Sequence, residues 1–417
     1  PKFMGSFYYS SHIPSLNNEL IINVEKGINI KYKILNADGL NIEFTKEEKK
    51  NSTIYKWKTV NINAIKDYDN APNFRYYEPH IIFYITDYEV DGKIKKVLGT
   101  PKELYNWYYS LKKNVNKNED ARLKAITDSL TTGVKDEMEK VKKIFYWIQD
   151  NISYVAFEDG YGGFIPREAG LVYARKFGDC KDMSSITNEM LRMAGIKSYL
   201  TWIGSRDIPY TYADVPTPSV DNHMITAYQD KQKKWYFLDA TGKKAPIDLH
   251  TSFIQGKQAL IGISADSFLL VTVPTYDTSI NQSVDSVTIN INGKIITGKG
   301  RAKLSGYNGL NYTYRTEHMN KEDKEDYFYR FFTKGNNKVK FSDINISEAD
   351  RKPLDITYTF ELPDYIRVNQ DEMYINLNFD NNIGLETIDK DRKIPVEFLN
   401  KTKFYFRKDI PKNTAML

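Results

Sequence analysis

The spacing of apolar residues changes twice along this 417-residue chain, and these changes constrain the fold more than any other feature. Over residues 1–115, short runs alternate apolar and polar residues between Asn, Asp and Gly turns, as in 19–24 and 53–57. Such alternation is typical of antiparallel strands with one buried face. Residues 273–417 return to this pattern, with one helix-like stretch over 321–332. We therefore predict two β-rich, sandwich-like domains, over 1–115 and 273–417.

The middle section, residues 116–272, begins with helical spacing. Apolar residues recur at helical intervals from Val134 to Ile148, which predicts a helix ending near Asp150. The apolar residues between 183 and 194 also recur at helical intervals, which predicts a second helix with one buried face. Gly195 follows and is a typical helix end. Because the chain is too long for one ordinary core, we expect this section to be a separate central domain.

The single cysteine of the chain, Cys180, stands directly before the second of these helices. Unpaired backbone N–H groups and the helix dipole at a helix start favour a thiolate over a thiol. The same N–H groups can bind a developing oxyanion. Cys180 is therefore a candidate nucleophile, and its backbone is a candidate oxyanion donor.

A predicted hairpin supplies a histidine and a carboxylate. The polar stretch 229–234 separates two short apolar runs that read as strands. With the turn centred on Lys231, His223 and Asp239 lie directly opposite each other, and the carboxylate accepts from Nδ1 while Nε2 is left for the thiol. A slip of one residue would place the two side chains on opposite faces. Cys180, His223 and Asp239 then form a candidate catalytic triad of nucleophile, base and orienting group.

Charge and composition argue against several other functions. The chain has 59 Lys and Arg residues against 54 Asp and Glu residues and no basic stripe, so we expect no nucleic-acid partner. The chain has no apolar run of about 18 residues, so we expect no membrane-spanning helix. With one cysteine, the chain cannot form an internal disulfide. We expect no metal ion and no other cofactor, because the remaining histidines lack partners at ligand spacing: His12, His80, His250 and His318.

Each member of the candidate triad also has a structural interpretation. A lone buried cysteine commonly behaves as a small apolar residue. A lone histidine on a strand is commonly structural, and an aspartate at a strand end commonly forms a turn. The order of the three residues and the helix-start position of Cys180 favour the catalytic interpretation.

Four blocks of the chain resemble the transglutaminase-like superfamily core, over roughly residues 118 to 270. The blocks are 143–154, the Phe-Gly-Asp-Cys-Lys-Asp motif at 177–182, Asn-His at 222–223, and 235–241. The Gly-Asp-Cys-Lys-Asp part is similar to a group of bacterial, mostly secreted proteins in which this core lies between β-sandwich domains. The resemblance implies a papain-like fold with Cys180 as nucleophile, His223 as base and Asp239 as orienting group. It also implies a location in the periplasm or at the cell surface.

The expected fold class is therefore α+β, with a papain/transglutaminase-like core of helix-start cysteine and antiparallel sheet between two β-rich, sandwich-like domains. The expected function is that of a thiol protease or amidase, or a cross-linking transferase, acting on peptide or side-chain amides. The substrate would be a peptide or protein, with glycan and cell-wall peptide as further options, and the oligomeric state is left open. Tyr154 is a further candidate oxyanion donor, with a core aromatic as the alternative.

The rival function is a non-catalytic binding or assembly protein of the cell surface that keeps the core as a scaffold. The chain starts at Pro1 rather than Met, so we expect that a targeting segment has been removed. Residues 415–417 show no domain-ending signal, so we also expect that the C-terminal domain continues beyond this end.

Overall fold

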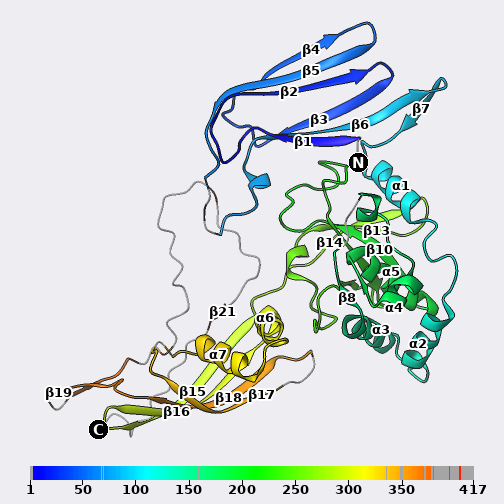
Figure 1. The fold of residues 1–417 in the computed structure, drawn as a ribbon. Coiled ribbons are helices and arrows are strands. Elements are labelled where there is room, and N and C mark those ends of the chain that lie inside the picture. Colours follow the sequence, from blue (N-terminus) through cyan, green and yellow to red (C-terminus); the bar gives the residue numbers. More distant parts are fainter. Residues whose placement is uncertain are drawn as a thin grey trace. The chain divides into compact units, whose positions relative to one another are not determined.

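The computed structural model describes residues 3–66, 68, 70–156, 160–334, 336–347, 351–370, 372–376, 379, 394 and 403–404. The chain divides into two compact units. One consists mainly of Pro1–Lys243 and His250–Thr275, and the other mainly of Lys244–Leu249 and Tyr276–Asp391 (Figure 1). The finer division into three domains at residues 115 and 272 stays a prediction.

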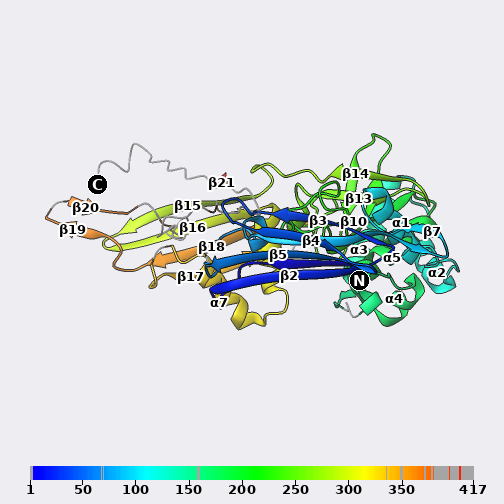
Figure 2. The ribbon, with the colours of Figure 1, turned by 90° about the horizontal axis from the view of Figure 1, so that it is seen from above.

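The first unit begins with two antiparallel sheets whose inner faces share a small core around the buried Trp57. Strands β2 and β5 run side by side in both ribbon views (Figures 1 and 2). The alternating pattern of the sequence thus forms the predicted β-rich, sandwich-like arrangement. One sheet contains β1 (Met4–Tyr8), β6 (His80–Val90), β3 (Ile28–Leu35) and β7 (Lys93–Lys96), and the other contains β2 (Ser15–Glu25), β5 (Ser52–Ile62) and β4 (Glu43–Glu48).

The rest of the first unit is an antiparallel sheet covered by helices. The strand order is β12-β11-β10-β13-β14. The strands are β10 (Ser198–Ile203), β11 (His223–Gln229), β12 (Trp235–Leu238), β13 (Gln258–Gly262) and β14 (Phe268–Thr272). The helices are α1 (Pro101–Lys112), α2 (Ala121–Thr131), α3 (Glu137–Asn151), α4 (Ala169–Arg175) and α5 (Cys180–Met193). Two short strands, β8 (Ser153–Tyr154) and β9 (Phe177–Gly178), pair in parallel just before α5.

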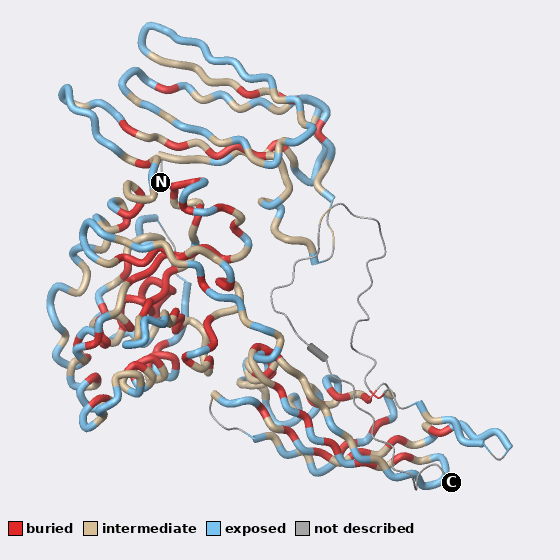
Figure 3. Tube along the Cα trace, turned by 180° about the vertical axis from the view of Figure 1, so that it is seen from behind, coloured by how far each residue is buried: buried red, intermediate tan, exposed pale blue. Residues whose placement is uncertain are grey.

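Helix α5 lies in the interior of this domain. It packs against β10 and β11 of the sheet and against the helices α2, α3 and α4. Of its residues, Asn188 and Arg192 alone are not buried. The sequence prediction of one buried face is therefore too narrow, because neighbours cover both the apolar and the polar side of the helix. Figure 3 shows how buried residues concentrate in this region.

The second unit contains a sheet in the order β17-β18-β16-β15-β21. Its apolar core includes residues of the sheet and of α7, among them Phe328 and Tyr358. The predicted helix over 321–332 matches α7, whereas α6 is not predicted by the sequence pattern. The elements are β15 (Gln282–Asn292), β16 (Ile295–Leu304), α6 (Gly306–Thr316), α7 (Lys321–Phe331), β17 (Lys340–Ile346), β18 (Leu354–Leu362), the hairpin β19 (Arg367–Asn369) and β20 (Glu372–Tyr374), and β21 (Lys403–Phe404).

Gly178 directly precedes the start of α5, and there is no room for a larger residue at this position. A Cβ atom here would lie 2.4 Å from the Cβ atom of Asp182. Gly178→Ala should therefore displace Asp182 and lower the free energy of unfolding by about 1–3 kcal/mol, the usual cost of overpacking. Urea denaturation followed by circular dichroism measures this effect.

The control is Lys143→Ala on the exposed face of α3. It should stay within about 0.5 kcal/mol of the wild type, as is usual for surface substitutions. Equal stability of Gly178→Ala and the wild type would contradict the close packing at the start of α5.

Candidate active site

Cys180 is the first residue of α5, as its sequence context predicts. Asp179 is the N-cap, and its carboxylate accepts hydrogen bonds from the backbone N–H groups of Lys181 (3.0 Å) and Asp182 (3.3 Å). The carboxylate of Asp182 accepts in return from the backbone N–H of Asp179 at 3.0 Å. This reciprocal capping box explains why the helix begins here. It gives Cys180 a rigid backbone although the residue lies at a helix end.

Two ion pairs surround this helix start. Lys181 is buried, and its ammonium group lies 2.7 Å from the carboxylate of Asp179. The guanidinium group of Arg167 pairs with the buried Asp182. Each buried charge therefore has a partner of opposite sign, as burial requires. Arg167 is distant in sequence from the Cys180 motif, and no local pattern points to it.

The hairpin of β11 and β12 has a different register from the predicted one. Gln229 pairs with Trp235, so the turn centres on Gln232, one position later than predicted. Asp239 therefore follows the last paired residue and is not directly opposite His223. The two side chains still meet, with 2.8 Å between Nε2 and Oδ2, because a register change of two residues keeps each side chain on its face.

The imidazole ring of His223 is turned the other way from the prediction. Nε2, not Nδ1, faces the carboxylate of Asp239. Nδ1 therefore does not contact Asp239, and Cys180 is near enough to the imidazole to raise its pKa. The ring also packs edge-to-face on Phe253, with 5.1 Å between the ring centroids. Strand pairing alone cannot predict this orientation, because it depends on the side-chain rotamer and on a neighbour distant in sequence.

Asp239 is buried and held by several donors. Besides His223, the hydroxyl groups of Thr241 and Thr251 and the backbone N–H of Thr241 donate to its carboxylate. Burial by itself would raise the pKa of Asp239, but the imidazole and the two hydroxyl groups lower the pKa to about 2. An Asp-x-Thr turn signal could have indicated Thr241. Nothing in the local sequence indicates Thr251.

The same contacts control the charge of His223. Burial would lower the pKa of the imidazole, but the carboxylate of Asp239 and, to a lesser extent, the side chain of Cys180 raise it to about 10. Both partners therefore favour the protonated imidazole. The structure thus brings Cys180, His223 and Asp239 into one connected arrangement.

Tyr154 lies in β8 and pairs with Gly178 of β9, which is two residues before Cys180 in the chain. Its side chain is 44% exposed, which excludes the interpretation as a core aromatic. Its role as an oxyanion donor stays a prediction.

The other histidines form no metal site in the ranges that the structure describes. The two ring nitrogens of His80 lie 2.7 Å from the carbonyl of Glu78 and 2.5 Å from the hydroxyl of Tyr210. Burial lowers the pKa of His250 to about 4, so this ring is neutral at pH 7. No three His, Cys, Asp or Glu residues of the described part are grouped so as to bind a metal ion.

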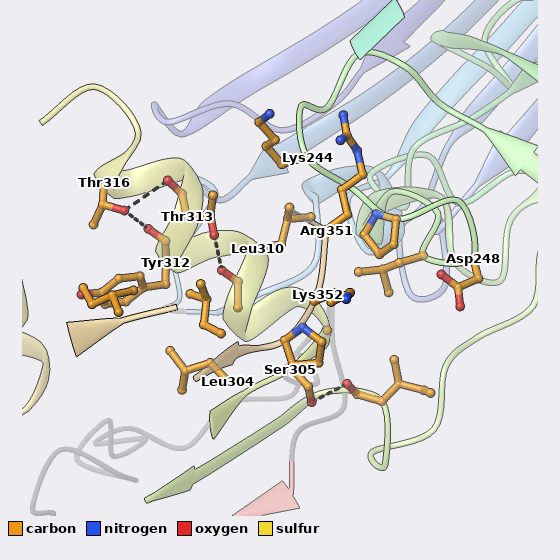
Figure 4. Close-up of a pocket in the computed structure, with 18 of the residues that line it drawn as sticks. Lys244, Asp248, Leu304, Ser305, Leu310, Tyr312, Thr313, Thr316, Arg351 and Lys352 are labelled. Carbon is orange, nitrogen blue, oxygen red and sulfur yellow. Dashed lines mark hydrogen bonds between the residues drawn. The ribbon is translucent and has the colours of Figure 1, made fainter. Parts of the chain in front are cut away.

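A cavity of about 820 Å³ lies in the second unit (Figure 4). Residues of α6, including Leu310 and Thr313, line it, and Lys244, Arg351 and Lys352 join them from loops. The volume is in the range of small-molecule sites. None of the three triad residues lines this cavity, so we place the candidate active site at the start of α5 and not here.

The sequence profile of the transglutaminase-like superfamily matches residues 124–240, a range that contains all three candidate triad residues. No curated protein sequence matches the chain significantly.

Among solved structures, the chain is similar to a candidate protease from Parabacteroides distasonis, with a TM-score of 0.50 and 12% identity over 89% of this chain and 69% of that one. A candidate cysteine protease from Cytophaga hutchinsonii gives a TM-score of 0.24 at 12% identity, over 57% of this chain and 75% of that one. The periplasmic domain of TgpA from Pseudomonas aeruginosa gives 0.22 at 11% identity, over 56% and 72%.

The first of these structural similarities shows a shared fold. The profile match covers α3, α5, β11 and β12, the elements on which the site is built. Residues 124–240 of this chain therefore match the transglutaminase-like superfamily, within an α+β fold that the first of these structures shares.

Proposed function

We propose that this chain is a thiol enzyme that cleaves peptide or side-chain amides through Cys180, His223 and Asp239. The observation that carries the proposal is the chain of contacts from the carboxylate through the imidazole to the cysteine. His223 contacts Asp239 through Nε2, and Cys180 is near enough to raise the pKa of the same imidazole. A thiol beside a protonated imidazole ionises readily, because the positive charge stabilises the thiolate.

The reaction would follow from these positions. The thiolate of Cys180 attacks the amide carbonyl and forms a C–S bond, and the oxyanion is bound by the backbone N–H of Cys180, which takes no part in the capping box. The imidazolium of His223 gives its proton to the leaving amine as the C–N bond breaks. The neutral imidazole then takes a proton from water, whose oxygen attacks the acyl group and releases the thiolate. Asp239 keeps the ring oriented and compensates its charge throughout.

Hydrolysis is favoured over cross-linking as the second step. Water is abundant, and transfer to an amine requires a cleft that excludes water. A cross-linking transferase would use the same three residues, with an amine in place of water. The substrate class is thus a peptide or a protein side-chain amide, and peptides carried by glycans or the cell wall have the same chemistry.

One observation favours the rival function, a binding or assembly protein that uses the core as a scaffold. Cys180 is 4% exposed, so a bulky acyl substrate reaches the thiol only if the surrounding loops admit it. A scaffold, however, does not need a buried imidazole paired with both a carboxylate and a thiol.

We further propose that the protein acts in the periplasm or at the cell surface. None of the described helices is long and apolar enough to span a membrane. The resemblance of the cysteine motif to mostly secreted bacterial proteins supports the periplasm or the cell surface as the place of action.

Alkylation of Cys180 measures its ionisation directly, since the chain has no other cysteine. A free thiol with a pKa of about 8.5 is only about 0.3% thiolate at pH 6. We expect iodoacetamide to react with the wild type at pH 6 about tenfold or more faster than with His223→Ala, in which the imidazolium is absent. Intact mass spectrometry follows the reaction.

Cys180→Ala is the matched control and should show no modification. p-Nitrophenyl acetate provides the corresponding test of acyl transfer, because acylation of Cys180 releases nitrophenolate and adds one acetyl group to the mass. Acetylation that is equally fast in wild type and His223→Ala, with a free-thiol pH profile in both, would reject the proposed function.

The pair of His223 and Asp239 should also make stability depend on pH. Asp239 has its pKa lowered from 3.8 to about 2, so its contribution is complete above about pH 4 and is lost as the pH falls toward 2. His223 has its pKa raised from 6.5 to about 10, so its contribution is complete below pH 6.5 and is lost as the pH rises toward 10. The difference in unfolding free energy between wild type and Asp239→Asn should therefore be largest between about pH 4 and 6.5.

Urea denaturation at a series of pH values measures this difference, with the exposed Asp207→Asn as the control. A difference between wild type and Asp239→Asn that stays constant from pH 4 to pH 10 would mean that His223 is not charged by its partners.

A further inference from the structure

The hydroxyl group of Ser184 lies between the backbones of the two reacting groups. Its oxygen is 2.8 Å from the carbonyl oxygen of Cys180, in its own helix, and 2.8 Å from the carbonyl oxygen of Met224 in β11. Met224 directly follows His223. Ser184 is 3% exposed, so its hydroxyl proton has no alternative partner in bulk water. One hydroxyl therefore links the residue that bears the thiol to the neighbour of the residue that bears the imidazole.

A second hydroxyl group donates a hydrogen bond from the strand to the helix. Thr226 in β11 donates to the carbonyl oxygen of Ser184 at 3.1 Å. Thr226 is fully buried, like the helix residues it meets. The two bonds connect the same turn of α5 to the same segment of β11, and neither belongs to the regular hydrogen bonding of the helix or the sheet.

Apolar packing between a helix and a strand allows small shifts along the strand, whereas a hydrogen bond is sensitive to distance and angle. In a thiol enzyme such a shift matters, because a displacement of about 1 Å can cost about a hundredfold in rate. Cys180 is one turn of helix before Ser184, and His223 is one residue before Met224. The bonds from Ser184 to Met224 and from Thr226 to Ser184 therefore join α5 and β11 close to Cys180 and His223. A shift of the helix along the strand at this point would change the distance between the thiol and the imidazole.

Thr187 provides a comparison, because its hydroxyl group bonds only within α5. It is as deeply buried in α5 as Ser184, and its hydroxyl donates to the carbonyl of Met183, within the same helix, at 2.6 Å. Many buried Ser and Thr residues in helices satisfy their hydroxyl groups in this way. Ser184 differs because its second acceptor belongs to the strand that bears the base.

We propose that Ser184 and Thr226 are positioning residues that fix α5 on β11 and so hold Cys180 beside the imidazole of His223. The proposal rests on the proposed function, in that it concerns the same thiol and imidazole. Both side chains are buried, which suits a positioning role rather than contact with the substrate. Their effect acts through the register of α5 on β11 and hence through the thiolate–imidazolium pair.

The test is the pH dependence of Cys180 alkylation by iodoacetamide, together with the melting temperature, in four single variants of the full chain. Thr226→Val keeps the shape but loses the hydroxyl, and Thr226→Ser keeps the hydroxyl. Ser184→Ala removes the bridging hydroxyl, and Thr187→Val removes the local one. We expect about a tenfold loss of rate at pH 6 in Thr226→Val and Ser184→Ala, as misplacement weakens the ion pair. Thr226→Ser and Thr187→Val should keep the wild-type profile.

A merely structural role would lower the melting temperature and leave the pH profile unchanged. Wild-type profiles in both Thr226→Val and Ser184→Ala would therefore overturn the proposal, as would an equal loss in Thr187→Val. If Ser184→Ala does not fold, the comparison of Thr226→Val with Thr226→Ser decides by itself. Failure of the proposed function is distinct, because the wild type would then already have a free-thiol profile that His223→Ala does not change.

Discussion

The chemistry of the core domain depends on how the helix α5 lies on the strand β11. Cys180 begins the helix and His223 begins the strand, so one helix–strand contact brings both groups together. Apolar side chains hold the two elements in contact. The buried hydroxyl groups of Ser184 and Thr226 restrict their relative position, because a buried hydroxyl that loses its acceptor is costly.

Burial also explains the charges around the site. A buried carboxylate such as Asp239 stays ionised only with donors and an opposite charge, which His223, Thr241 and Thr251 supply. The protonated imidazole is favoured for the same reason, because the carboxylate of Asp239 and the nearby Cys180 side chain oppose the effect of burial on its pKa. At the helix start, Lys181 compensates Asp179 in the same way. Removing one partner would leave its neighbour buried and unpaired, so the stability of each charged group depends on the presence of its partner.

Much of the fold could be predicted because it depends on local spacing. The strands of the N-terminal sheets follow alternation, and the start of α5 at Cys180 follows from the apolar period behind it. Helix α6 was missed because its sequence is rich in Gly, Asn and Tyr, which have low helix propensity, and packing in the second unit stabilises it instead. The extent of burial of α5 was missed for a related reason, since Ser184, Ser185 and Thr187 look like an exposed polar face until other elements cover them.

The sequence by itself determined that Cys180 begins a helix, that His223 and Asp239 share one face of a hairpin, and that the three occur in the order of a thiol triad. These features depend on periods of two and 3.6 residues, which neighbouring residues specify. Only the tertiary structure decided the register of the hairpin, the ring nitrogen that faces Asp239, and the contributions of Thr251 and Ser184. These depend on contacts between segments far apart in the chain, whose distances no local period encodes.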